Sequence, residues 1–200
     1  MGIERLHRFV ASATQHYAAC PDRHDTLQAE TVLVPRIREA LAELVAQDDW
    51  LPDEYAQPHP KFYQQYLLHC DPLERFSLVS FVWGPGQGTP VHDHTVWGLI
   101  GMLRGEEHSR GFQKEQGRLV PDGEVEILKP GMIGRVTPTG EQDIHQVRNA
   151  LDDRVSISIH FYNGNIGKIH RHVFDPDTAA PKDFVSGYAN RNLPNIWGMQ

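Results

Sequence analysis

The sequence predicts a mainly β fold of antiparallel strands, preceded by α-helices. Apolar residues follow the helical period up to about residue 50 and the two-residue period of β-strands from Phe76 onward. Gly and Pro, with 17 and 14 residues, mark short turns in the second part. No helix-length amphipathic run lies between about residues 76 and 174, so successive strands should pair antiparallel in a barrel or a sandwich.

Residues 2 to about 50 are predicted to be helical. Pro35 suits the first turn of a second helix, and Pro52 interrupts the helical pattern. Two apolar stripes at helical spacing define the helices, namely Ile3, Leu6, Val10 and Ala13, and then Ile37, Leu41, Leu44 and Val45.

Five later segments have the composition and alternation of β-strands. Gly-Pro or Asp-Gly turn signals separate many of them. The predicted strands are residues 76–83, 96–105, 124–128, 132–136 and 155–162.

The composition limits the possible partners and location. A net charge of −7 argues against a general nucleic-acid surface, since binding phosphates requires clustered Lys and Arg. The apolar runs are too short to span a membrane. Cys20 and Cys70 are too few for a disulfide framework, and no signal peptide precedes them, so a reducing cytoplasm is expected. The sequence leaves the oligomeric state open.

Histidines carry the strongest chemical signal, with 12 in the chain. His92 and His94 lie two residues apart, so on a strand both rings would face one side while Asp93 faces the other. His145 lies in another strand-like stretch that a barrel could bring beside them. Three imidazoles on rigid strands could hold a metal ion and leave its other positions open. Any one of them could instead be a surface or hydrogen-bonded core histidine.

The residues around these histidines resemble the two motifs of the cupins. Gly98 stands where most cupins carry a metal-binding glutamate, whereas three histidines are kept, and this combination resembles the cysteine dioxygenase family of thiol dioxygenases. The first motif is formed by Gly86, His92, His94, Gly98 and Gly105, and the second by Pro138, Gly140, His145 and Asn149.

This resemblance implies one cupin domain over residues 1–200. Its body would be a small antiparallel β-barrel or jelly roll over about residues 60–174. A helical part over about 1–55 would precede the barrel, and an irregular, Pro- and Asn-rich segment over about 175–200 would wrap it.

The resemblance also implies Fe(2+) as the cofactor, held by His92, His94 and His145. Three neutral ligands leave the double positive charge of the ion uncompensated, which favours an anionic fourth ligand such as a thiolate. Glycine at position 98 would also vacate space around the ion. Zinc is the alternative metal, because three histidines plus water also describe a hydrolytic zinc site.

The strand predicted over 155–162 has an apolar face and a polar face. A polar face of this kind usually meets solvent. Here Ser158, His160 and Tyr162 match, residue by residue, the outer-sphere catalytic triad of thiol dioxygenases. The match implies that the Tyr162 hydroxyl points at the substrate, and that the other two residues orient it.

The substrate-binding residues are expected to be Arg171 and Gln65. Arg171 could clamp a carboxylate bidentately. Gln65, or Gln64 if the register shifts, aligns near an arginine of the cysteine-oxidising members. Glutamine there together with Arg171 resembles the bacterial 3-mercaptopropionate dioxygenases. Those members lack the cysteine that is cross-linked to the active-site tyrosine, and no Cys follows residue 70, so Tyr162 should be unmodified.

A second His-x-His pair, His170 and His172, is a competing metal site. On a strand, both would face away from Arg171, so the pair and Arg171 could not serve the same interior.

The expected reaction joins a small thiol carboxylate and O2 to give 3-sulfinopropionate from 3-mercaptopropionate. Sulfur supplies all four electrons, so neither an organic cofactor nor an external reductant is needed. Three alternatives remain open: a cysteine dioxygenase that makes cysteine sulfinate, a non-catalytic cupin that binds a small ligand, and a metal-dependent cupin with another activity, such as an isomerase.

Overall fold

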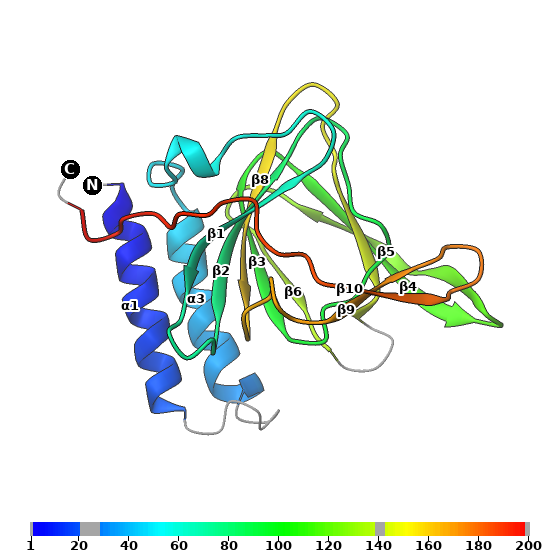
Figure 1. The fold of residues 1–200 in the computed structure, drawn as a ribbon, viewed down its shortest axis with the longest axis horizontal. Helices are drawn as coiled ribbons and strands as arrows, with labels where there is room; N and C mark the ends of the chain where they lie inside the picture. The colour runs from blue at the N-terminus through cyan, green and yellow to red at the C-terminus, as the bar shows by residue number, and fades with distance from the viewer. Residues whose placement is uncertain (1, 21–28, 139–142, 199–200) are drawn as a thin grey trace.

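The computed structural model describes residues 2–20, 29–138 and 143–198. Figure 1 shows two helices along one side of a β-barrel, and a C-terminal segment that runs back across the barrel toward the N-terminus. The helices, a five-stranded sheet and a second sheet form successive layers. The prediction of a mainly β, antiparallel barrel preceded by helices is confirmed.

The helices are α1 (Ile3–Ala19) and α3 (Val34–Val45), with a π-helical turn at Ala29–Leu33 and a short 3-10 helix at Asp53–Tyr55. Helix α3 ends before residue 50, where the predicted helical part ended, and residues 21–28 of that part lie outside the described residues. Pro35 lies in the first turn of α3 as expected. Both predicted apolar stripes are buried. In the described part of the chain, no helix combines the length and the apolar composition that crossing a bilayer requires.

The five-stranded sheet has the order β1-β2-β8-β3-β6, and every neighbouring pair is antiparallel. Its outer face packs on the helices: a Cβ added at Gly101 would lie only 2.8 Å from Val45 of α3. The central strands β2 and β8 are buried on both faces. The strands are β1 (Gln64–Cys70), β2 (Ser77–Trp83), β3 (Gly98–Arg104), β6 (Ile133–Val136) and β8 (Ser156–Tyr162).

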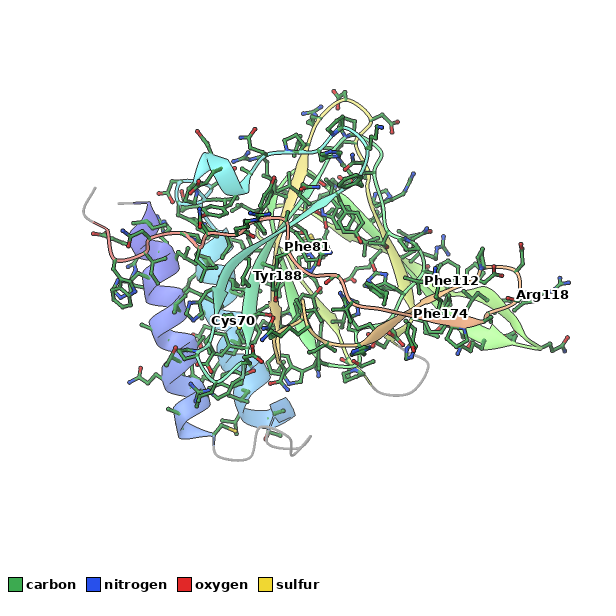
Figure 2. The ribbon with its side chains drawn as sticks, viewed as in Figure 1. Cys70, Phe81, Phe112, Arg118, Phe174 and Tyr188 are labelled. Atoms are coloured by element: carbon green, nitrogen blue, oxygen red, sulfur yellow. The ribbon has the colours of Figure 1, made fainter. Side chains whose placement is uncertain are left out.

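The second sheet closes the barrel opposite the first. Strands β5, β4 and β7 pair in that order, and the chain around His92 bridges both β7 and β9. The β4–β5 hairpin extends beyond the barrel, with Arg118 near its tip (Figure 2). The strands are β4 (Glu107–Glu115), β5 (Arg118–Leu128), β7 (His145–Asn149), β9 (Arg171–Phe174) and β10 (Pro181–Phe184).

Several strand bounds differ from the sequence prediction. β1 and β4 were not among the predicted strands, and β5 begins six residues earlier than its predicted segment. Most residues of β1 and β4 are intermediate in burial rather than alternately buried and exposed, and their sequences lack the apolar and polar alternation that reveals a strand. The C-terminal segment was predicted to be irregular, but it includes β10, which pairs with β9.

Candidate active site

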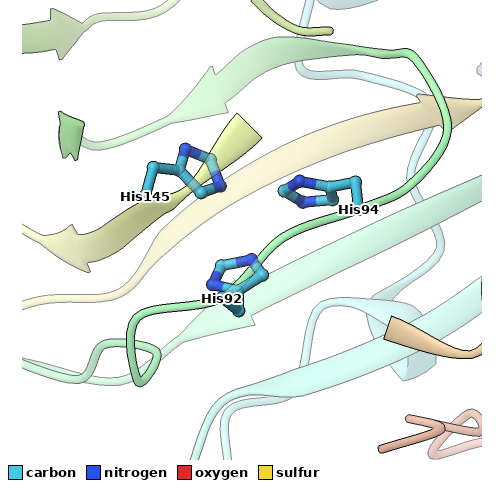
Figure 3. A group of neighbouring side chains, drawn as sticks. All are labelled: His92, His94 and His145. Carbon is cyan, nitrogen blue, oxygen red and sulfur yellow. The ribbon is translucent and has the colours of Figure 1, made fainter. Parts of the chain in front are cut away.

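The imidazoles of His92, His94 and His145 converge inside the barrel (Figure 3). Their candidate ligand nitrogens all lie within 4.8 Å of one another. His145 begins β7 and pairs with His92 through two backbone hydrogen bonds of 2.9 Å, which explains how distant segments meet. The pair His92 and His94 lies just ahead of β3 rather than inside a regular strand.

Two of the rings are oriented by hydrogen bonds at Nδ1. His92 Nδ1 lies 3.1 Å from the carbonyl oxygen of Pro90, to which it can only donate. His94 Nδ1 lies 3.0 Å from the carboxylate of Asp143, which also accepts the backbone N–H of His94 at 2.6 Å. Both rings therefore keep the Nε2 lone pair for a metal ion.

The third ring completes the donor set. His145 Nδ1 lies 3.1 Å from the Ser109 hydroxyl, and its Nε2 is buried without a hydrogen-bond partner. Burial lowers the pKa of His92 and His94 well below the ordinary value and that of His145 to about 4. Three neutral imidazoles with free Nε2 atoms fit a divalent metal, and this donor set alone suits iron and zinc alike.

Gly98 allows a close contact between β3 and β8. A Cβ at this position would lie 2.7 Å from Cδ1 of Tyr162 and 2.9 Å from the carbonyl oxygen of Phe161. The Tyr162 ring therefore takes up space that a side chain at position 98 would need. Glycine is required here because strand β8 brings this ring directly against β3.

The polar face of β8 forms a continuous hydrogen-bonded chain. Ser158 Oγ lies 2.8 Å from His160 Nε2, and His160 Nδ1 lies 2.8 Å from Tyr162 Oη. The three residues are 0, 5 and 1% exposed, so this face does not meet solvent. Trp83, which sequence reasoning missed, donates from Nε1 to Ser158 Oγ at 3.3 Å.

One cavity of about 220 Å³ brings the predicted residues together. Its size lies below the range of roughly 300–1,000 Å³ for drug-sized ligands, so it suits a small molecule. Ser158 alone among the predicted site residues does not line it, because this side chain lies behind His160. The predicted residues in the wall are His92, His94, His145, His160, Tyr162, Arg171 and Gln65.

Arg171 is held in the cavity wall by contacts that leave part of the guanidinium unused. It is 3% exposed, its Nη2 donates to Ser186 at 2.8 Å, and its guanidinium lies 4.6 Å from the ring centroid of Phe184. Its Nε is buried without a partner. Burial lowers the pKa of Arg171, while the neighbouring hydroxyls of Tyr162 and Tyr63 act in the opposite direction.

The structure distinguishes the two glutamines. Gln65 lines the cavity, and its Oε1 is buried without a partner. The Gln64 amide donates at 3.1 Å to the carbonyl oxygen of Tyr63 and does not line the cavity. Position 65, rather than 64, therefore faces the cavity.

The second His-x-His pair lies away from this cavity. His170 is exposed, and His172 lies 2.7 Å from the carboxylate of Asp93. Arg171 faces the cavity while both neighbours face elsewhere, as strand alternation predicts. Within the described ranges, the cluster of His92, His94 and His145 is the one His, Cys, Asp or Glu group able to hold a metal.

Comparisons with known proteins indicate the family of this chain. A profile of the family "Cysteine dioxygenase type I" matches residues 24–175. Cysteine dioxygenase type 1 of Danio rerio is 22% identical over 146 residues, which cover 70% of either chain.

Among solved structures, a double-stranded β-helix protein from Klebsiella pneumoniae is 19% identical, with a TM-score of 0.44 over 66% of this chain and 91% of its own. A cupin superfamily protein from Desulfitobacterium hafniense is 15% identical, with a TM-score of 0.43 over 60% and 94%. Since the family profile spans more than half of the sequence, this chain belongs to the cysteine dioxygenase type I family of thiol dioxygenases.

Proposed function

We propose that this protein is an iron-dependent thiol dioxygenase of the cytoplasm that oxidises 3-mercaptopropionate to 3-sulfinopropionate. One observation carries the proposal: three buried polar atoms without partners, His145 Nε2, Arg171 Nε and Gln65 Oε1, belong to residues that line one cavity. A buried polar group without a hydrogen bond costs about 1–3 kcal/mol. A metal ion would satisfy His145 Nε2, and a substrate carboxylate would accept a hydrogen bond from Arg171 Nε, whereas Gln65 Oε1 requires a donor such as a water molecule.

The reaction balances without another reactant. One thiol and one O2 give one sulfinic acid, the sulfur losing four electrons and the two oxygen atoms gaining them. Fe(2+) bound by the three histidines would supply the positive charge that ionises the thiol and the open-shell chemistry that lets a thiolate react with O2. Tyr162 donates a hydrogen bond to the reacting oxygen atoms, and Arg171 holds the substrate carboxylate at the other end.

The charges of the cavity favour 3-mercaptopropionate over cysteine. Arg171 and Lys182 are the charged side chains in its wall as the structure describes it, and no Asp or Glu lines it there. The ammonium group of cysteine would therefore meet positive charge and find no carboxylate partner. Gln65 lies in the same wall, and its neutral amide can donate to a carboxylate without adding charge.

The test is oxygen uptake by the iron-loaded protein with 3-mercaptopropionate, cysteine and cysteamine, together with detection of the sulfinate. We expect the highest kcat/KM for 3-mercaptopropionate and one sulfinate for each O2 consumed. A higher kcat/KM for cysteine would show a cysteine dioxygenase. Ligand binding without oxygen uptake would show a non-catalytic protein, and turnover by the zinc form would show a different metal chemistry.

A further inference from the structure

A second, smaller cavity lies next to the histidine cluster of the substrate cavity. It has a volume of about 20 Å³ and shares His145, His160, Ile100 and Val147 with the substrate cavity. Such a volume is enough for one water molecule. Unlike the substrate cavity, it is lined by acidic side chains, Glu107 and Glu126.

Glu107 is a buried carboxyl that the proposed reaction does not otherwise use. It begins β4, is 1% exposed and accepts a hydrogen bond of 3.3 Å from Ser156 at Oε1. Its Oε2 is buried and makes no hydrogen bond of regular geometry. The hydroxyl of Ser158, two residues along the same face of β8, also acts on this carboxyl by lowering its pKa. Burial is the larger effect and raises the pKa of Glu107 to about 8.

We propose that Glu107 is a positioning residue that extends the Ser158–His160–Tyr162 chain and fixes the direction in which its hydrogen bonds run. The inference rests on the proposed function, because the direction matters only if Tyr162 donates to the reactants.

The direction follows from counting protons along the chain. For Tyr162 to donate into the cavity, its oxygen must accept from His160 Nδ1–H, so Nε2 must accept from the Ser158 hydroxyl. The Ser158 oxygen then accepts from Trp83 and has one lone pair left. A protonated Glu107 donates to that lone pair and completes the chain.

An ionised Glu107 would reverse the chain. The Ser158 hydroxyl would turn to the carboxylate, His160 would donate from Nε2 to Ser158, and Nδ1 would accept the Tyr162 proton. Tyr162 would then point its proton away from the substrate cavity. The protein therefore benefits from a carboxyl that stays neutral, and burial favours the neutral form.

The groups around the small cavity support the neutral form. Glu126 on β5 lines it, and burial raises the pKa of this carboxyl as well. Arg135 on β6 lines the same cavity. His145 on β7 and His160 on β8 are neutral, because burial lowers the pKa of each.

The first test reads the carboxyl without iron or substrate. The infrared spectrum of the metal-free protein at pH 6.5 should contain the C=O stretch of a protonated carboxyl. Glu107→Gln should remove that band, and Glu126→Gln should leave it. A wild-type spectrum without the band, or one that Glu107→Gln does not change, would overturn the proposal.

The second test separates positioning from a merely structural role. Glu107→Leu should lower kcat at least about tenfold, with KM for 3-mercaptopropionate and iron content unchanged. Glu107→Gln, which can donate to Ser158 and accept from Ser156, should recover most of that loss. In a Ser158→Ala background, Glu107→Leu should change kcat less than about twofold, because the loss of Ser158 has already interrupted the hydrogen-bonded chain that links Glu107 to Tyr162. Additive losses, or equal losses in the Gln and Leu variants, would overturn the proposal.

The two proposals fail in different ways. A wild-type protein that consumes no oxygen with any of the thiols contradicts the proposed function. The infrared band would still report whether Glu107 is protonated.

Discussion

Asp93 holds His172 through two hydrogen bonds of 2.7 Å, one to the backbone N–H and one to ring Nδ1. Asp93 lies between the metal-site residues His92 and His94, whereas His172 is adjacent to Arg171. The link therefore fixes the position of the guanidinium relative to the metal site. Sequence alternation predicted that Asp93 faces away from the histidine cluster, and the structure shows that it binds His172.

His172→Ala should weaken carboxylate binding more than metal binding. The ring hydrogen bond is lost while the backbone one remains, so KM for 3-mercaptopropionate should rise about two- to tenfold, as expected for one hydrogen bond. Iron content should stay at the wild-type level. His170→Ala is the matched control, since this neighbour is exposed, and it should leave KM unchanged. An equal rise in both variants would contradict the role of the link.

The sequence predicted those parts of the site that lie within short segments. The alternation around His160 follows from the two-residue period of a strand, and the family resemblance added the roles of the residues. His92 and His94 converge as predicted, although they lie outside a regular strand. The remaining parts of the site come together only in the folded protein. Asp143 and Ser109 contact His94 and His145 from distant parts of the sequence, and Glu107 on β4 contacts Ser156 on β8. No local pattern carries such contacts.

The same limit explains the errors in the fold. Most residues of β1 and β4 are intermediate in burial, and their sequences do not alternate between apolar and polar residues. The contact between Gly98 and the Tyr162 ring was also not predicted, because Tyr162 lies on a strand whose register only the folded barrel reveals.

Asp143→Asn should lower metal affinity about 10–100-fold, because this carboxylate orients the His94 ring and its backbone. Ser109→Ala should act in the same direction through His145. Competition with a chelator measures both effects. Glu106→Gln is the control. Glu106 pairs with His108, which is not part of the metal site, so the metal affinity of this variant should equal that of the wild-type protein. Unchanged affinity in Asp143→Asn would show that the ring needs no such orientation.

Gly98→Ala should displace the Tyr162 ring, because the new Cβ would lie 2.7 Å from it. We expect kcat to fall at least about tenfold and the free energy of unfolding to fall by about 1–3 kcal/mol. Gly101→Ala is a matched control on the same strand, because its Cβ would meet Val45 and Leu41 of α3 instead. The control should lose stability and keep kcat, and a similar loss of kcat in both would attribute the effect to general unfolding.

Arg171→Met should raise KM for 3-mercaptopropionate about 10–100-fold, the cost of losing charge-assisted hydrogen bonds to a carboxylate. KM for cysteamine, which has no carboxylate, should not rise. Lys182→Met removes the other cation of the cavity wall, which is exposed, and should have a smaller effect. Steady-state oxygen uptake with both thiols gives the comparison. A parallel rise for cysteamine would show that Arg171 shapes the cavity rather than binding the carboxylate.

The free energy of unfolding of the metal-free protein should fall both at low pH, because of His145, and at higher pH, because of Glu107. Burial lowers the pKa of His145 to about 4, so the unfolded chain binds the proton first as the pH falls below about 6.5, and stability is lost toward pH 4. Burial raises the pKa of Glu107 to about 8, so its contribution is fully present below about pH 4.5 and is lost as the pH rises through 8.

Comparison with Glu107→Gln measures the contribution of Glu107 alone, because the amide cannot ionise. Relative to this variant, the wild-type protein should lose up to about 1.4 kcal/mol of unfolding free energy for each pH unit between about 4.5 and 8. Urea denaturation of both metal-free proteins at several pH values measures the difference, and Glu126→Gln controls for removing a neighbouring carboxyl. A difference that stays constant across this range would mean that the Glu107 carboxyl ionises as easily in the folded protein as in the unfolded chain. The hydrogen-bond chain would then run away from the substrate cavity at neutral pH.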